Sequence, residues 1–419
     1  MTRNRYVDLL RAASILVVVL GHWTMAAVTV RDGELTVGHL LVLAPWTHPL
    51  TWVFQVMPVF FLVGGYANAL SWRAARRRGE NYGAWLRARV RRLALPVVPV
   101  LLAWLAGGAV ATATGVDVST LRLASTVALV PTWFLAAYIL VVAVAPVTLV
   151  AWERWRWWTL LAGALAAAAV DWVSLTTGSL TLGFVNYLVV WASVHQLGYA
   201  WVDGALGRRR RVGLAALGLA GLALLVTVGP YPVAMVGVDT AAVNNTFPTR
   251  VTMLFLGLLQ AGVVLALEPA GRRLAADTRV WAAVVAANTR IMTVYLWHVT
   301  AMVLVVGVAL LAGGTGMDVE PLGVTWWLTR PAWYAVLGAA TVGLVLLLGR
   351  FERPVADPRP APAWWRPVLA VAGVCGGLAG LALEGIADAD GLHVWPVAVT
   401  LASLVVGGTL RPPTWFRQR

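Results

Sequence analysis

The sequence predicts an all-α fold: a polytopic bundle of about ten to twelve transmembrane helices with both termini in the cytoplasm. Three observations predict it: the composition, the length of the apolar runs and the placement of the arginines. Hydrophobic residues make up 60% of the chain and charged residues 12%, and the mean hydropathy is +0.78. Soluble domains do not reach such values. We therefore expect an integral membrane protein, located in a bacterial-type plasma membrane.

Apolar runs of spanning length recur along the whole chain. About 20 apolar residues cross the hydrocarbon core of a bilayer, and this length gives about twelve expected spans. The run at 280–287 is too short to span, so we expect an interfacial or re-entrant helix there. The expected spans are 7–29, 50–71, 93–113, 131–150, 157–177, 184–202, 212–229, 249–267, 291–312, 327–349, 367–386 and 394–410.

The arginines give the orientation. The chain contains no lysine, and its net charge is +14. With a cytoplasmic N-terminus, nearly all arginine clusters fall in cytoplasmic loops, as the positive-inside rule requires, while the external loops hold mostly acidic residues. Orientation thus accounts for the charge, and we expect no nucleic-acid partner. The cytoplasmic clusters are residues 73–78, 87–92, 154–156, 208–211, 272–290, 350–366 and 411–419.

Prolines divide the chain near its C-terminus. The stretch RPVADPRPAPAWWRP at 353–367 cannot continue a helix. We expect a ten-span membrane domain over 1–354 and a proline-rich cytoplasmic linker over 355–366. A C-terminal pair of helices over 367–410 and a basic tail over 411–419 complete the predicted organisation.

A polar seam enters the first span. Arg11 and His22 are separated by three helical turns, about 16 Å along the axis, and face within roughly 20° of each other. Arg5 and Asp8 share this stripe at three-residue spacing. Ionisable groups at membrane depth are costly unless they face protein or water, so these residues are functional candidates. Asp171 and His195 are also intramembrane, but they belong to no motif.

Four passages carry a family resemblance. The first is RYVDLLRAASILVVVLGHW at 5–23, with ten residues between its arginine and its histidine, and the second is FQVMPVFFLVGGY at 54–66. RARVRRLALP at 87–96, with WFL at 133–135, and TVYLWH at 293–298, with FERP at 351–354, follow in order. Together they resemble the acyltransferase 3 family of integral membrane acyltransferases. Gly64 replaces a commoner serine, and the last two spans lie beyond the usual core.

The resemblance implies an enzyme that transfers an acyl group to oxygen. The expected donor is a cytoplasmic acyl-CoA, acetyl-CoA in our expectation, and the acceptor is a hydroxyl of a sugar, glycolipid or glycosylated metabolite. No permanently bound cofactor is expected. His22 is the expected general base, because a positioned histidine can deprotonate a hydroxyl as it attacks a thioester. Arg11 is expected to bind the donor, and Asp8 to pair with Arg5 or Arg11 or to snorkel at the interface.

Further residues are assigned by type and position or by the resemblance. For the donor phosphates we expect cytoplasmic arginines, although positive-inside anchoring explains them equally well. The resemblance implies that Glu352 lies near the donor site, with a local pair to Arg350 or Arg353 as the alternative, and that Trp133 is a pocket wall, with an interfacial anchor as the alternative. For the acyl or acceptor pocket we expect aromatic residues and a histidine, with aromatic packing as the alternative. No metal site is expected, because His39, His48 and His393 are scattered and the only cysteine is Cys375. The donor-binding set is Arg5, Arg73, Arg76, Arg89, Arg92 and Glu352, and the substrate-binding set is Trp133, Tyr295, Trp297 and His298.

An alternative function from another class is a transporter or flippase for a lipid-linked sugar. A polytopic bundle with buried charges fits such a protein as well. Transporters of this kind usually contain related halves with paired interrupted helices, and the sequence shows no such repeat. The two functions are distinguished by the product, because an acyltransferase leaves an ester and a transporter moves an unmodified substrate.

Overall fold

The computed structural model is almost entirely helical and describes residues 4–31, 34–238, 243–352, 360, 362–388 and 390–410. Over these residues, ten helical segments are long and apolar enough to cross a membrane. An eleventh is added if α13 (Val251–Ala266) and α14 (Glu268–Leu274), which meet at a bend of 56°, form one span. The predicted all-α membrane bundle is therefore confirmed.

The helices and strands fall into two compact units, each assembled from three stretches of chain. Unit 1 comprises Met1–Trp72, Val144–Thr289 and Met317–Leu328, and unit 2 comprises Arg73–Ala143, Arg290–Gly316 and Thr329–Arg419. The helices α4 (Met57–Arg77), α8 (Pro131–Trp155) and α17 (Val324–Leu348) contribute residues to both.

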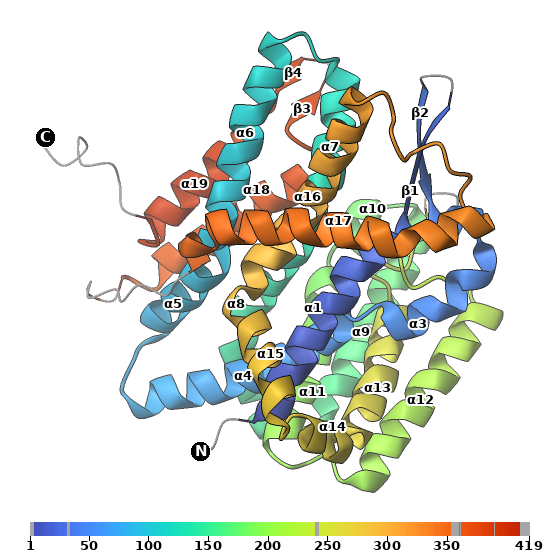
Figure 1. Cartoon of the computed structure of the whole chain (residues 1–419). Helices are drawn as coiled ribbons and strands as arrows, with labels where there is room; N and C mark the ends of the chain where they lie inside the picture. The colour runs from blue at the N-terminus through green and yellow to red at the C-terminus, as the bar shows by residue number, and fades with distance from the viewer. Residues whose placement is uncertain are drawn as a thin grey trace, which may run out of the picture. The chain divides into compact units, whose positions relative to one another are not determined.

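Unit 1 begins with α1 (Arg5–Met25) and a two-stranded hairpin of β1 and β2 (Figure 1). The predicted span at 7–29 is too long at its C-terminal end: α1 ends at Met25, and residues 26–31 form a strand that pairs with residues 34–39. The elements of unit 1 are α1 (Arg5–Met25), β1 (Ala26–Arg31), β2 (Glu34–His39), α2 (Leu40–Leu43), a 3-10 helix (Pro45–Leu50), α3 (Thr51–Phe54), α9 (Trp157–Thr177), α10 (Leu180–Gly183), α11 (Asn186–Val202), α12 (Arg208–Thr227), α13 (Val251–Ala266), α14 (Glu268–Leu274) and α15 (Thr278–Thr289).

Close backbone approach holds the helices of unit 1 together. A Cβ atom on Gly218 of α12 would lie 2.3 Å from the backbone nitrogen of Leu259 in α13, so only glycine fits there. Small residues permit such contacts between membrane helices, where association depends on packing rather than on the hydrophobic effect. The short apolar run at 280–287 is the helix α15, which packs against α1.

Unit 2 contains the C-terminal helices. Its elements are α5 (Tyr82–Ala94), a 3-10 turn (Leu95–Val97), α6 (Val98–Ala113), α7 (Val118–Leu129), α16 (Ile291–Leu311), a 3-10 turn (Gly349–Glu352), α18 (Trp365–Glu384), β3 (Ala387–Asp388), β4 (Gly391–Leu392) and α19 (Trp395–Val406), with its parts of α4, α8 and α17. The predicted span at 394–410 is wrong in length, because α19 has 12 residues and cannot cross a bilayer alone.

The C-terminal pair packs as a tight hairpin. A Cβ on Gly377 of α18 would lie 2.2 Å from the Thr400 hydroxyl of α19. The predicted linker falls mostly on residues outside the described part, as does the predicted tail at 411–419. Of its described residues, Pro360 accepts a hydrogen bond of 2.9 Å from the guanidinium of buried Arg87 in α5. Arg87, a residue of the basic 87–92 cluster, thus fastens the predicted linker to α5 at Pro360.

Candidate functional site

The predicted polar seam lies on one uninterrupted helix. The Asn4 side chain caps α1 by accepting the Tyr6 N–H, and the helix continues through 21 residues to Met25. Arg11 and His22 therefore keep their helical spacing of about 16 Å along the axis. His22 is half-buried in the last turn, where its carbonyl accepts the N–H of Ala26 at the start of β1. This places the imidazole where the helix meets the hairpin.

The charged residues at the start of α1 are held by protein contacts in unit 1. Asp8 is 7% exposed and lies 4.0 Å from the guanidinium of Arg11. Of the two partners that the sequence allowed, Arg5 and Arg11, the structure thus pairs Asp8 with Arg11. Arg5 instead lies over the ring of Trp281, 4.8 Å from its centre, and donates to the carbonyl of Ala275. A cation over an aromatic face is attracted electrostatically. Arg5 thus fastens α1 to the α14–α15 region.

A pocket of about 530 Å³ opens in unit 1 beside the N-terminus of α1. Its charged lining is a triad in which Glu268 binds both Arg211 and Arg272, at 2.9 and 2.7 Å. Glu268 is 6% exposed, so the triad compensates a carboxylate at the end of α13. Asn4, Tyr66, Trp201, Val202, Gly204 and Pro269 complete the lining.

A buried histidine unrelated to any motif lies between α4 and α11. His195 is completely buried, with Nε2 3.1 Å from the amide nitrogen of Asn68 and Nδ1 2.9 Å from the hydroxyl of Tyr199. An amide nitrogen only donates, so Nε2 accepts and Nδ1 carries the proton. Both ring nitrogens are satisfied within the core, which gives His195 a structural role.

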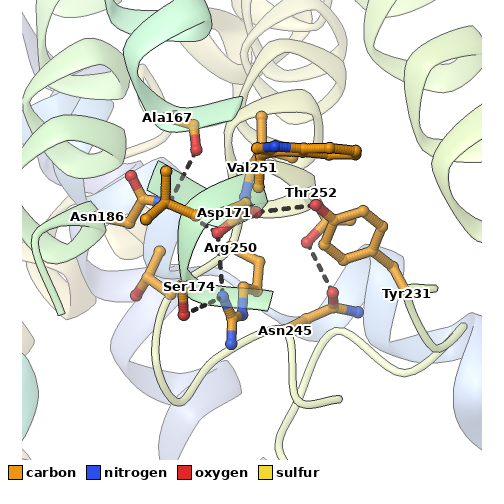
Figure 2. A network of polar contacts seen from close by, with 12 residues as sticks. Ala167, Asp171, Ser174, Asn186, Tyr231, Asn245, Arg250, Val251 and Thr252 are labelled. Carbon is orange, nitrogen blue, oxygen red and sulfur yellow. Dashed lines mark hydrogen bonds and ion pairs between the residues drawn. The ribbon is translucent and has the colours of Figure 1, made fainter. Parts of the chain in front are cut away.

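A second buried network joins α9 to the start of α13 (Figure 2). Asp171 and Arg250 are 1% and 4% exposed and form an ion pair of 3.4 Å. The carboxylate also accepts hydrogen bonds from the Asn186 amide, the Val251 N–H and the Tyr231 hydroxyl, at 2.8, 2.7 and 3.1 Å. The sequence identified Asp171 as intramembrane but gave it no partner. The pairing appears only in three dimensions.

Unit 2 contains the predicted substrate-binding residues, and three of them share one cluster. Tyr295 donates to the carbonyl of Pro131 at 2.8 Å and packs edge-on against Phe134, which also packs against Trp133. His298 is completely buried, and its Nδ1 donates to the Tyr295 carbonyl at 2.7 Å. Trp297 is also buried, at 4% exposure. Of the four, only Trp133 is half-buried.

Glu352 binds the N-terminus of a helix of its own unit. Its carboxylate accepts the backbone N–H groups of Met292 and Thr293, at 3.0 and 2.8 Å, and the Thr293 hydroxyl at 2.6 Å. These groups belong to the first turn of α16, which is left without intrahelical acceptors. The acidic residue that resemblance assigned to the donor site is therefore a helix cap in this structure.

Four of the predicted phosphate-binding arginines lie on two consecutive helices, α4 and α5. Arg73 and Arg76 lie in the last turns of α4, and Arg89 and Arg92 lie in α5, all four within unit 2. Arg76 and Arg92 are exposed, whereas the Arg89 guanidinium lies 5.8 Å from the centre of the Trp85 ring. Over the described residues, no three His, Cys, Asp or Glu side chains gather as metal ligands would.

Together these features define a class of protein: an integral membrane helix bundle with ionisable groups buried among its spans. The family model of an acyltransferase domain matches residues 4–350. The chain therefore belongs to the acyltransferase 3 family, as its motifs predicted, and is a membrane acyltransferase. Neither the curated proteins nor the solved structures gave a significant match.

Proposed function

We propose that the protein is an O-acyltransferase of the bacterial plasma membrane. It takes an acyl group, acetyl in our proposal, from a cytoplasmic acyl-CoA and places it on a hydroxyl of a sugar, glycolipid or glycosylated metabolite. The observation that carries the proposal is His22 in the last turn of α1, in a chain of the acyltransferase 3 family. The family does not favour the transporter alternative.

His22 supplies the base that the reaction needs. A hydroxyl is a weak nucleophile at neutral pH, and general-base catalysis typically contributes about 10²- to 10⁴-fold. The imidazole takes the hydroxyl proton as the oxygen attacks the thioester carbonyl carbon. The new C–O bond forms, the C–S bond breaks, and the leaving thiolate takes the proton from the imidazolium. His22 is thereby neutral again for the next cycle.

The depth of His22 matches a donor and an acceptor that approach from opposite sides. Counted from Arg5, the histidine lies about 26 Å along α1, and the hydrocarbon core is about 30 Å thick. Arg11, about 16 Å before it, is within the reach of a pantetheine arm and is proposed to hold the phosphate end of the donor. Asp8 orients its guanidinium.

The remaining assignments are part of the same proposal. Arg5, Arg73, Arg76, Arg89 and Arg92 are proposed donor-phosphate ligands, because guanidinium groups bind phosphates through paired hydrogen bonds. Glu352 is assigned to the donor site through the stability of the α16 N-terminus that it caps. Trp133, Tyr295, Trp297 and His298 are proposed to shape the acyl or acceptor pocket, with Trp133 as its accessible member.

The experiment is a comparison of lipid and glycan extracts by mass spectrometry. Cells express the wild type, His22→Ala, His393→Ala or no protein, at matched levels. His393 is the control, because it lies beyond the residues that match the family. We expect an acyl mass increment with the wild type and His393→Ala only. Equal increments in wild-type and His22→Ala extracts contradict the role of His22.

A further inference from the structure

Unit 1 contains a buried segment without regular secondary structure between α12 and α13. Residues 231–238, here called the 231–238 segment, connect α12 towards α13, and Ala234 and Met235 are 2% and 0% exposed. Irregular backbone is tolerated at membrane depth only where protein or water satisfies its polar groups. The conformation of this segment must therefore be fixed by its surroundings.

Four consecutive carbonyls of the segment each accept a hydrogen bond from a side chain. The Asn245 amide donates to two of them, and Trp52 and Gln55 donate to the others. The Met235 N–H in turn donates to the Thr51 hydroxyl at 2.8 Å. The accepting carbonyls are those of Pro232 at 2.8 Å, Val233 at 2.8 Å, Ala234 at 2.9 Å and Met235 at 3.1 Å. The segment is thus bound to the 3-10/α3 region on one side and to Asn245, which precedes α13, on the other.

The buried ion pair anchors both ends of this loop (Figure 2). Tyr231, which begins the segment, donates to Oδ2 of Asp171, and the same oxygen accepts the N–H of Val251 where α13 begins. Arg250 adds its charge and a second hydrogen bond, 3.1 Å, to Ser174. Asp171 therefore fixes the start and the return of the loop at one point on α9.

The far end of the segment packs against the helix that carries His22. Ala234 and Val238 form a hydrophobic cluster with Leu41, and Val236 and Met25 pack against it. Met25 follows His22 by three residues, so the two side chains share a face of α1. Leu41 donates its N–H to His39, whose Cα is paired with Ala26 in the hairpin. The segment thus lies beside the outer end of the His22 face.

We propose that the 231–238 segment forms the outer wall of the acceptor site at His22, and that Asp171 and Arg250 are positioning residues that hold this wall. The inference rests on the proposed function. Because half-buried Val236 and Met25 of α1 pack against one apolar cluster, the acceptor presents an apolar group next to its reactive hydroxyl. A glycolipid or a glycoside of a hydrophobic aglycone has this chemistry, and a free polar sugar does not.

The position of the 231–238 segment relative to His22 is tested by chemical modification of His22, a readout that does not depend on enzyme activity. Diethylpyrocarbonate reacts with accessible imidazoles, and mass spectrometry quantifies the modified His22 peptide. We compare the wild type with Asp171→Asn, Tyr231→Phe and the control Glu268→Gln. Glu268 forms a comparably buried ion pair at the opposite end of α13, about 24 Å away by helical rise.

We expect His22 to be modified several-fold faster in Asp171→Asn and to a smaller degree in Tyr231→Phe, which loses a single hydrogen bond and retains the ion pair. Glu268→Gln is expected to match the wild type. Equal rates in the wild type and in folded Tyr231→Phe and Asp171→Asn overturn the proposal. A rate in Glu268→Gln as high as in Asp171→Asn also overturns it, because the effect is then general loosening.

The wall itself is tested by adding bulk to it. In a Cys375→Ser background, Val236→Cys is labelled with N-ethylmaleimide, and incorporation from radiolabelled acetyl-CoA into the organic extract of membranes is measured. We expect about tenfold to hundredfold less incorporation after labelling, since small displacements near reacting groups cost that much. Val228→Cys, at a position 79% exposed and just before the segment, is labelled as the control and keeps its activity.

The two failures are distinguishable. If membranes with Val236→Cys keep full incorporation after labelling, the proposal that the 231–238 segment forms the wall is overturned. Absence of incorporation by the unlabelled parent contradicts the acetyl donor of the proposed function, while the modification rates of His22 still decide the position of the segment.

Discussion

Gly198 and Gly65 lie where α11 and α4 of unit 1 come into backbone contact, and Gly198→Ala tests how tightly this crossing is packed. A Cβ on Gly198 would lie 2.2 Å from the carbonyl oxygen of Leu62 and 2.4 Å from the nitrogen of Tyr66. Both are backbone atoms, which no side-chain rotation can move away. We therefore expect the two helices to separate and the protein to lose stability.

The size of the loss follows from the contacts. Carbon atoms pack at about 3.5 Å or more, so the added methyl needs the helices to separate by roughly 1 Å. The hydrogen bond of 3.1 Å between Asn68 and His195 joins the same helices and is stretched beyond bonding distance. Overpacking costs about 1–3 kcal/mol, and unsatisfied buried polar groups add about 1–3 kcal/mol. The expected total is about 2–6 kcal/mol.

The measurement is the free energy of unfolding in detergent, determined by denaturant titration. Gly213→Ala in α12 is the matched control, since a Cβ at Gly213 meets nothing within 4 Å. Alanine is favoured over glycine in helices, so the control is expected to gain up to about 1 kcal/mol. Equal stability of Gly198→Ala and Gly213→Ala refutes the reasoning.

Substitutions at three further residues have defined outcomes. Glu352→Gln removes the charge that caps α16 and should lower the free energy of unfolding by about 0.5–2 kcal/mol, while Glu352→Asp in the same titration recovers part of it. Tyr295→Phe should lower the free energy of unfolding by about 1 kcal/mol, because the hydrogen bond from the Tyr295 hydroxyl to the Pro131 carbonyl is lost, and an unchanged value contradicts that bond. The Ser119 hydroxyl and the Thr120 N–H hold the pKa of Asp117 below its usual value. A depressed folded pKa gives stability that is present above the unfolded pKa, about 4, and is lost as the pH falls through the folded pKa. Asp117→Asn should therefore reduce the loss of helicity in acid that circular dichroism measures, and an unchanged acid profile refutes this.

Local pattern was sufficient for the class of fold and for the family. Hydrophobic runs of about 20 residues predict membrane helices because each span satisfies its own backbone hydrogen bonds, independently of distant residues. The spacing of Arg11 and His22 likewise depends only on one helix, and α1 preserves it. The motifs predicted the family that matches residues 4–350. Span ends were less predictable, since a strand at residues 26–31 is as apolar as the helix before it.

Long-range pairing was decided by the tertiary structure alone. The sequence separates Asp171 from Arg250 by 79 residues and Glu352 from Thr293 by 59, and nothing local indicates either contact. The same holds for the 231–238 segment, whose hydrogen bonds come from residues 51–55 and from Asn245. A buried polar group must find a partner, but which partner it finds depends on how the helices pack. The sequence by itself therefore determined the helices, the family and the predicted base, and the packing determined which charges anchor the loop beside it.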